Sequence, residues 1–193
     1  MTLIARRLRQ ERKRRGWTLE QLAAQAQVSR AMISRIERGE ANPSATLLVR
    51  LGDALGQSLS ALMSEPPAPQ ASALRRLAEQ PQWVDPDTGY VRRMVSPTGV
   101  ADEVEIIAVD LPAGAQVRFA PTARLRYDQQ VLLTAGRLRV QAGSEWFELA
   151  PGDCLRMATD GEHGFHNPGT EPARYLVVAR GVVVRDPGRD APA

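Results

Sequence analysis

The chain has 193 residues, of which 43% are hydrophobic and 24% are charged, and its formal net charge is +3. This composition is enough for a packed core and is ordinary for a soluble protein. It excludes a membrane span, because no apolar run approaches about 18 residues, and the basic amino terminus lacks the apolar stretch of a signal peptide. A lone cysteine, Cys154, cannot form an intrachain disulfide or a cysteine-based zinc cluster, and we expect it to pack in a strand. We expect a cytoplasmic protein of bacterial type.

The charge is distributed unevenly along the chain. Residues 1–63 carry 11 Lys and Arg against 5 Asp and Glu, whereas the remaining residues carry 14 against 17. A basic end joined to a mildly acidic end suggests a nucleic-acid-binding module followed by a unit of another kind. The alternative is that the arginines of the first helix only form a solvated face.

Residues 18–39 predict two short helices joined by a tight turn. Thr18 and Gln21 have the spacing of a capping box at the start of the first helix. Ser29 can cap the second helix, and Gly39 ends it. One face of this second helix is apolar, with Met32, Ile33 and Ile36, and the other carries Arg30, Ala31, Ser34 and Arg35. This is the layout of a helix-turn-helix whose second helix can enter the major groove of DNA.

Further helices are predicted on both sides of this motif. Residues 3–15 predict a helix that ends at Gly16, Ser44 starts a helix that ends at Gly56, and Ser58 caps a last short helix. We therefore expect an all-α domain of five helices over residues 1–63.

The stretch from Leu3 to Met63 resembles the phage-repressor (Xre-type) helix-turn-helix family. The resemblance rests on the segments LRQERKRRGWTLEQLA, VSRAMISRIERGEANPS and LLVRLGDALGQSLSALM. It implies that Arg12 pairs with Glu37 in a structural ion pair, although a phosphate contact by Arg12 is an alternative. Gln27 departs from the family, which usually has a turn glycine there, and a left-handed Gln costs roughly 1 kcal/mol. The resemblance and the helical pattern together imply base-reading by Arg30, Ala31, Ser34 and Arg35, and phosphate contacts by Thr18, Gln21, Arg38 and Asn42.

The composition changes after the helical region. Residues 64–82 are rich in proline and read as a linker, with a possible short helix over 71–79. Residues 83–187 predict an all-β barrel or sandwich, and residues 188–193 a tail. Short strands are expected at 90–95, 104–111, 116–120, 130–134, 137–141, 146–149, 154–157 and 174–184.

The second half resembles the cupin family, whose fold is a double-stranded β-helix. The resemblance rests on Gly136 before a strand, Gly143, the sequence LAPGDCLRM, and His163 four residues before Asn167. Metal-binding cupins carry further histidines and a glutamate in their first motif, but here Thr122, Arg124 and Gln129 occupy the matching positions. Because metals such as iron, manganese and zinc usually need at least three protein ligands, we expect no metal and no cofactor.

The cupin resemblance also implies an effector pocket without a metal. Strand alternation places Gln129 on one face with Val131 and Leu133, and the resemblance turns Gln129 inward. It brings Arg124 and His163 to the same cavity, with Arg126 and His166 as neighbours. Arginines there would suit a carboxylate or a phosphate. The alternatives are that Arg124 and Arg126 lie on a solvent-facing strand edge, and that His163 is a hydrogen-bonded residue of the barrel wall.

These features predict a two-domain, sequence-specific transcriptional regulator. Its helical domain would bind a palindromic operator in double-stranded DNA as a homodimer, and its cupin-like domain would sense a small effector, which could be anionic, or build the dimer. We expect that it is not an enzyme. Two alternatives stay open: a cupin enzyme with an autoregulatory DNA-binding domain, and a barrel that only dimerises.

Overall fold

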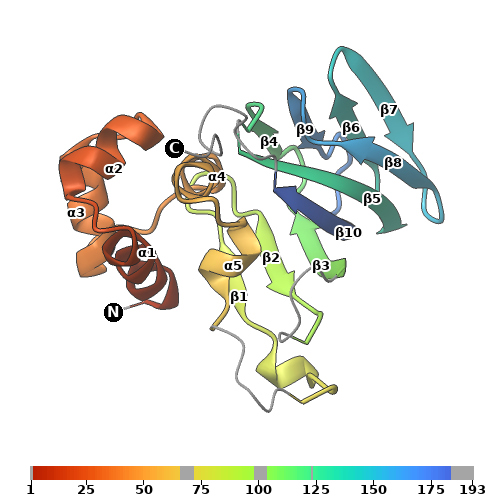
Figure 1. The fold of residues 1–193 in the computed structure, drawn as a ribbon. Helices are drawn as coiled ribbons and strands as arrows, with labels where there is room; N and C mark the ends of the chain where they lie inside the picture. The colour runs from red at the N-terminus through yellow and green to blue at the C-terminus, as the bar shows by residue number, and fades with distance from the viewer. Residues whose placement is uncertain (1, 66–71, 98–103, 123, 184–193) are drawn as a thin grey trace.

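The structure is a computed structural model and describes residues 2–65, 72–97, 104–122 and 124–183 (Figure 1). Five helices form the amino-terminal part: α1 (Leu3–Arg14), α2 (Leu19–Ala26), α3 (Arg30–Arg38), α4 (Ala45–Leu55) and α5 (Leu59–Met63). The five predicted helices and the β-rich second half are therefore confirmed.

The helix ends follow from their capping residues. Thr18 and Gln21 form the capping box at the start of α2, and the Ser29 side chain accepts a hydrogen bond from the amide of Met32 at the start of α3. Gly39 ends α3 in the left-handed region, with φ 76°. The apolar side chains that these helices turn inward share a cluster made of Leu8, Leu22, Ala26, Ile33, Ile36, Leu51, Ala54 and Leu55.

Gln27 ends α2 in the left-handed conformation that the family turn requires. Its φ is 53°, the single positive value of a non-glycine residue in the described part of the chain. The exposed side chain of Arg50, in the middle of α4, donates to the Gln27 carbonyl. The turn thus forms in spite of its side chain, at the conformational cost that left-handed residues other than glycine carry.

The carboxyl-terminal part folds as two antiparallel sheets. One sheet has the strand order β1-β2-β3-β10-β5-β8, and the other the order β4-β9-β6-β7. The strands are β1 (Gln82–Val84), β2 (Val91–Met94), β3 (Val104–Leu111), β4 (Gln116–Phe119), β5 (Leu125–Ala135), β6 (Leu138–Ala142), β7 (Glu145–Leu149), β8 (Cys154–Ala158), β9 (His163–His166) and β10 (Ala173–Val183).

Two strands were not expected from the sequence. β1 lies where the linker ends, and β9 contains the histidines of the cupin motif. Within 72–82 the structure has only a short 3₁₀ helix, Leu77–Glu79, in place of the possible helix over 71–79. Residues 66–71 of the predicted linker, residue 123 and the predicted tail at 188–193 lie outside the described residues. The proposed boundaries of the two domains remain predictions.

The two parts pack tightly against each other. In Figure 1, α4 and α5 lie between α1–α3 and the barrel. A single apolar cluster runs from helical residues such as Leu48 and Leu62 to barrel residues such as Trp83 and Tyr90. In this structure the helical part is therefore packed directly against the barrel.

Candidate DNA-binding face and ligand cavity

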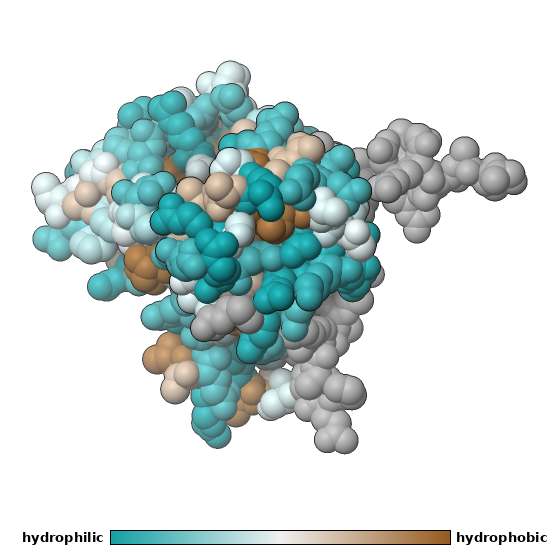
Figure 2. Space-filling view, turned by 90° about the vertical axis from the view of Figure 1, so that its left-hand side faces the viewer, coloured by the Kyte–Doolittle hydropathy of each residue, from teal (hydrophilic) through white to brown (hydrophobic). Residues whose placement is uncertain are grey.

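Helix α3 presents the predicted base-reading side chains to solvent. Ile33 and Ile36 are 0% and 1% exposed and fix the inner face of the helix. Arg30, Ala31 and Arg35 are exposed on the other side, and Ser34 is half-buried. Figure 2, in which the side of Figure 1 that holds α1–α3 faces the viewer, shows a mainly hydrophilic surface. A polar face with exposed arginines suits nucleic acid better than an apolar partner.

Two cations on this face, Arg30 and Arg38, pair with exposed carboxylates. Arg30 lies 2.6 Å from Glu20 on α2, and Arg38 lies 2.6 Å from Glu40. The hydrogen bond from Arg38 lowers the pKa of Glu40. Because such exposed pairs contribute little stability, phosphates or bases can replace the carboxylates at small cost.

The predicted phosphate contacts do not all lie on this face. Thr18 and Gln21 are exposed at the amino end of α2, where backbone N–H groups favour anions. Arg38 is exposed and also donates to Ser34. The Asn42 side chain is engaged by the barrel: it donates to the Val84 carbonyl at 3.2 Å and accepts from Trp83 Nε1 at 3.1 Å. The phosphate role predicted for Asn42 is therefore corrected to a contact between the two parts of the chain.

Arg12 and Glu37 form the structural ion pair that the family resemblance implied. Arg12 Nε and Nη2 donate to the two carboxylate oxygens of Glu37 at 2.7 Å each, and Arg12 Nη1 donates to the Trp17 carbonyl at 2.8 Å. The hydrogen bond to Glu37 raises the pKa of Arg12. This buried fork ties α1 to the end of α3 and so fixes the angle of the recognition helix.

Most other arginines of α1 also have a structural partner. Glu11, which is buried, accepts from Arg14 and Arg15 at 2.9 Å and lies 3.6 Å from Arg7. Burial alone would raise the pKa of the Glu11 carboxyl, but the hydrogen bonds from Arg14 and Arg15 outweigh it and lower that pKa. The basic character of α1 therefore contributes in large part to folding.

A cavity of about 90 Å³ lies where the helices meet the open end of the barrel. The barrel supplies most of its wall, and the α4–α5 turn supplies the rest. Its lining includes the barrel residues Tyr90, Arg92, Glu105, Phe119, Thr122, Leu125, Tyr127, Gln129, Thr159, His163, Phe165, Val177 and Ala179, and the helical residues Val49, Gln57, Ser58, Leu59 and Ser60.

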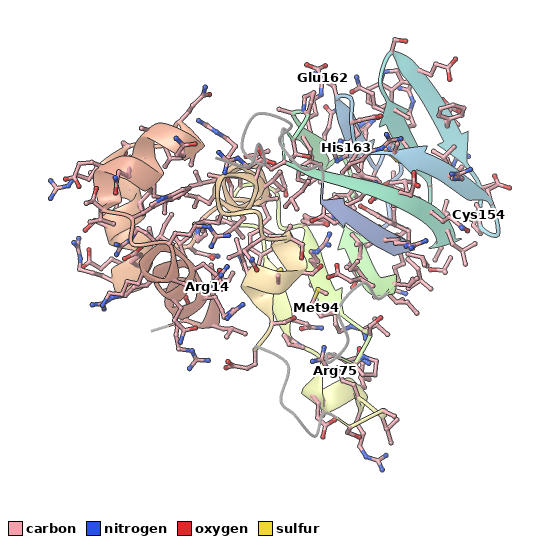
Figure 3. All side chains as sticks on the ribbon, viewed as in Figure 1. Arg14, Arg75, Met94, Cys154, Glu162 and His163 are labelled. Carbon is pink, nitrogen blue, oxygen red and sulfur yellow. The ribbon has the colours of Figure 1, made fainter. Side chains whose placement is uncertain are left out.

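Gln129 and His163 line this cavity together. Gln129 is 8% exposed, on the same face of β5 as the fully buried Val131 and Leu133. The His163 ring stacks on Phe119 with centroids 5.1 Å apart, and its Nδ1 lies 3.2 Å from the Gly161 carbonyl. Burial lowers the pKa of His163, so the neutral ring is favoured. Figure 3 shows His163 on the side of the barrel that faces α4 and Cys154 at its far edge.

Arg124, Arg126 and His166 do not line the cavity. Arg124 lies at the junction instead, where its amide donates to Asp53 at 2.8 Å and its guanidinium donates to Gln25 at 3.0 Å. Arg126 is exposed and lies 3.6 Å from Asp160, which agrees with the alternative that it faces solvent. His166 pairs in register with Gln116 and Arg139 on the smaller sheet. These three pocket assignments are corrected: Arg124 precedes β5 and binds α4, and strand alternation turns Arg126 and His166 to the faces opposite Gln129 and His163.

Arg92 is the cavity cation that the sequence reasoning missed. Its Nη1 lies 3.3 Å from the Tyr90 hydroxyl and its Nη2 lies 3.1 Å from Ser60 Oγ, while its Nε is buried without a hydrogen-bond partner in the described structure. Alternation along β2 could have revealed it. Tyr90 and Met94, two residues to either side, are both buried, so Arg92 faces inward between them.

Three further sequence expectations concern metal ligands, a membrane span and the cysteine. Among the described residues, no three His, Cys, Asp or Glu side chains cluster as metal ligands would. No described helix is long and apolar enough to cross a membrane. Cys154 lies in a strand as expected, but its side chain is exposed and not packed, because β8 is an edge strand of the larger sheet in the described structure.

The fold and these two sites define a helix-turn-helix domain followed by a cupin domain. Residues 8–62 match the family model described as helix-turn-helix, and residues 110–179 match the model described as cupin domain. The chain therefore joins an Xre-type DNA-binding domain to a cupin domain, which is the architecture of a transcriptional regulator.

The chain is similar to named transcriptional regulators over most of its length or over its helical part. The chain is 27% identical over 169 residues to the HTH-type transcriptional regulator SutR of Escherichia coli, covering 87% of this chain and 89% of that protein. It is 36% identical over 64 residues to the HTH-type transcriptional regulator SinR of Bacillus licheniformis, covering 33% and 58%. A crystal structure of an HTH_3 family transcriptional regulator from Vibrio cholerae is 26% identical, with a TM-score of 0.73, and the match covers 93% of this chain and 95% of that one.

Proposed function

We propose that this protein binds a specific operator in double-stranded DNA through α3 and regulates transcription in the cytoplasm. The observation that carries this proposal is the placement of Arg30, Ala31 and Arg35 on the exposed side of a helix whose other face is fixed by Ile33 and Ile36. Arginine can bind guanine O6 and N7 through two hydrogen bonds, and an alanine methyl can contact thymine. Thr18, Gln21 and Arg38 flank this helix as phosphate contacts.

We also propose that the protein acts as a homodimer. A single helix-turn-helix reads only a few base pairs, whereas two copies related by a two-fold axis read a palindrome with half-sites about 34 Å apart. The close packing of α4 and α5 on the barrel supports a rigid protomer. The barrel would therefore carry the dimer contact and set the spacing between the two recognition helices.

The cupin domain, in this proposal, senses a small effector and does not catalyse a reaction. The supporting observation is the cavity into which Gln129 and His163 converge beside the helical domain. The proposal includes no metal, because Thr122 and Gln129 stand where metal-binding cupins have ligands. The rival function, a barrel that only dimerises, predicts that no small molecule alters DNA binding.

Selection from a random pool of duplex DNA by the full-length protein tests the DNA-binding role. We expect an enriched inverted repeat whose half-sites lie one helical turn apart, protected symmetrically in a footprint. Sedimentation of the complex should give two protomers per site. Enrichment of no sequence motif would contradict the proposal, and so would full affinity of a 21.1 kDa monomer for a half-site alone.

A metabolite screen on that operator then tests the sensor role. We expect at least one small molecule to shift both the midpoint of thermal unfolding and the operator affinity. Near-stoichiometric iron, zinc or manganese in the gently purified protein would instead favour the cupin-enzyme alternative.

A further inference from the structure

The cavity is shared between the two domains. The segment from Gln57 to Ser60 forms part of its wall, and Ser58 is also the N-cap of α5, where its hydroxyl accepts from the Ala61 amide at 2.8 Å. On its other side, α5 buries Leu62 completely, and its Ala61 carbonyl accepts from Arg7 Nε of α1 at 3.4 Å. A molecule in the cavity would therefore contact a helix that is continuous with the packing of the DNA-binding domain.

Arg92 gives this cavity a positive group that is partly unused. Two of its guanidinium nitrogens bind Tyr90 and Ser60, but the buried Nε has no acceptor within the described residues. Because Nε is closed to solvent, a ligand would bind the remaining N–H groups of Nη1 and Nη2, each of which has a single hydroxyl partner in the described part of the chain, and a carboxylate is the acceptor that best fits these planar donors. Ser60 belongs to the DNA-binding part, so an anion that binds Arg92 would act next to the link between the domains.

Glu105 gives the same cavity a negative group, at a different position along the strands from Arg92. Arg92 of β2 pairs with Val109 of β3. Glu105 lies on β3, four residues before Val109, and pairs with Ala179 of β10. The two side chains form no salt bridge with each other in the described structure. A ligand with a carboxylate at one end and a hydrogen-bond donor at the other would be complementary to both groups.

The remaining walls restrict the size of such a ligand. Phe119, Leu125, Phe165 and Val177 supply apolar surface, and the volume of about 90 Å³ corresponds to roughly three water molecules at about 30 Å³ each. A nucleotide or a sugar phosphate is too large for this space. The geometry favours a compact molecule of a few heavy atoms.

We propose that the interdomain cavity binds a compact amino- or hydroxycarboxylate, with its carboxylate on Arg92 and its ammonium or hydroxyl group toward Glu105, in contact with the start of α5. This inference rests on the proposed sensor role and names the class of effector. Binding there couples effector occupancy to the DNA-binding domain through Ser58 and Ser60.

Four probes of nearly the same shape test the assignment by calorimetry on the full-length protein. Alanine carries a carboxylate and an ammonium, lactate a carboxylate and a hydroxyl, isobutyrate only a carboxylate, and isopropylamine only an ammonium. We expect alanine or lactate to bind at least about tenfold more tightly than isobutyrate and isopropylamine. The preferred one of the two identifies the donor that faces Glu105.

Substitutions in the protein test the contacts at the two ends of the ligand separately. Arg92→Gln should weaken the preferred probe by about 10- to 100-fold, and Arg92→Lys, which keeps the charge but not the fork, by less. Glu105→Gln should reduce the preference over isobutyrate. Arg126→Gln, which removes an exposed arginine of the same barrel outside the cavity, should leave all four affinities unchanged. Circular dichroism and the unfolding midpoint show whether each variant folds.

Each contrary result contradicts one named part of the proposal. Unchanged affinity in folded Arg92→Gln and Arg92→Lys overturns the carboxylate site, and equal binding of alanine, lactate and isobutyrate overturns the role of Glu105. If none of the four probes binds but another metabolite shifts operator affinity, the effector class is wrong while the sensor role stands. If no metabolite shifts operator affinity, the sensor role itself fails.

Discussion

The carboxylate of Asp85 caps helix α4 from the other domain. Asp85 Oδ1 accepts a hydrogen bond from the Ala45 amide at 3.0 Å, and Asp85 Oδ2 accepts from the Thr88 hydroxyl at 2.5 Å. Ser44 stands at the N-cap position of α4, but its side chain makes no capping hydrogen bond. The barrel therefore supplies the cap of a helix in the DNA-binding domain, and the first turn of α4 depends on the contact between the two.

Replacing Asp85 should weaken both the helix and the contact. Asp85→Ala leaves the buried Ala45 amide without its acceptor and should lower the free energy of unfolding by about 1–3 kcal/mol. Asp85→Asn keeps an acceptor for the Ala45 amide but loses the charge and the acceptor for Thr88, so its loss should be smaller than that of Asp85→Ala. Urea unfolding followed by circular dichroism measures both. Asp87→Ala, at an exposed aspartate of the same turn, is the control and should change little; an equal loss in that variant would contradict the capping role.

Replacing Gln27 should stabilise the helix-turn-helix. Gln27 has φ 53°, and glycine adopts this conformation without the contact between Cβ and backbone that penalises other residues. Gln27→Gly should therefore raise the free energy of unfolding by about 1 kcal/mol or slightly less, since glycine also gains freedom in the unfolded chain. Gly39→Ala, at φ 76°, is the reverse change and should lower it. A Gln27→Gly variant that unfolds more easily than the wild type would show that the turn carries no strain.

Removing Arg35 should relax the DNA sequence preference. Arg35 is exposed near the middle of α3, so Arg35→Ala should remove discrimination of about 1–3 kcal/mol at one base pair per half-site. The measurement compares the affinities of the selected operator and of operators changed at each position. Arg9→Ala, at an exposed arginine of α1, is a matched charge control and should leave the preference in place. Operator selectivity that survives the double change at Arg30 and Arg35 would contradict this assignment.

The helical domain could be predicted almost completely because its signals are local. Capping residues and apolar spacing fix each helix within a few residues, and the Arg12–Glu37 pair follows from the family pattern. The strand at 104–111 was placed to the residue, whereas β1 was hidden in a proline-rich stretch. Its three residues pair with β2 and Trp83 packs in the cluster shared with the helices, and both contacts are properties of the tertiary structure.

The cavity could be predicted only in part, because two domains build it. Gln129 and His163 follow from strand alternation and from the cupin spacing. The wall from Gln57 to Ser60 could not follow from either domain alone. The cupin resemblance assigned Arg124 to the cavity, but the Arg124 amide binds Asp53 of α4. The orientation of a side chain at the end of a strand depends more on its contacts with the neighbouring domain than on alternation along the strand.

His163 should make stability depend on pH near neutrality. Burial lowers its pKa in the folded protein, whereas an unfolded histidine titrates at about 6.5. Below that value the unfolded chain binds the proton first, so this contribution to stability is complete above about pH 6.5 and is lost as the pH falls toward the folded pKa. The slope within this window is at most about 1.4 kcal/mol per pH unit. Urea unfolding between pH 5.5 and 7.5 measures it, above the range of ordinary carboxylates.

A pair of variants assigns this slope to the buried ring. His163→Phe keeps an aromatic ring beside Phe119 and cannot titrate, so its unfolding free energy should be nearly independent of pH in the same interval. The chain has only one other histidine, and His166→Gln should retain the slope, because His166 lies outside the cavity lining. A slope that persists in His163→Phe would contradict the assignment to the buried ring of His163.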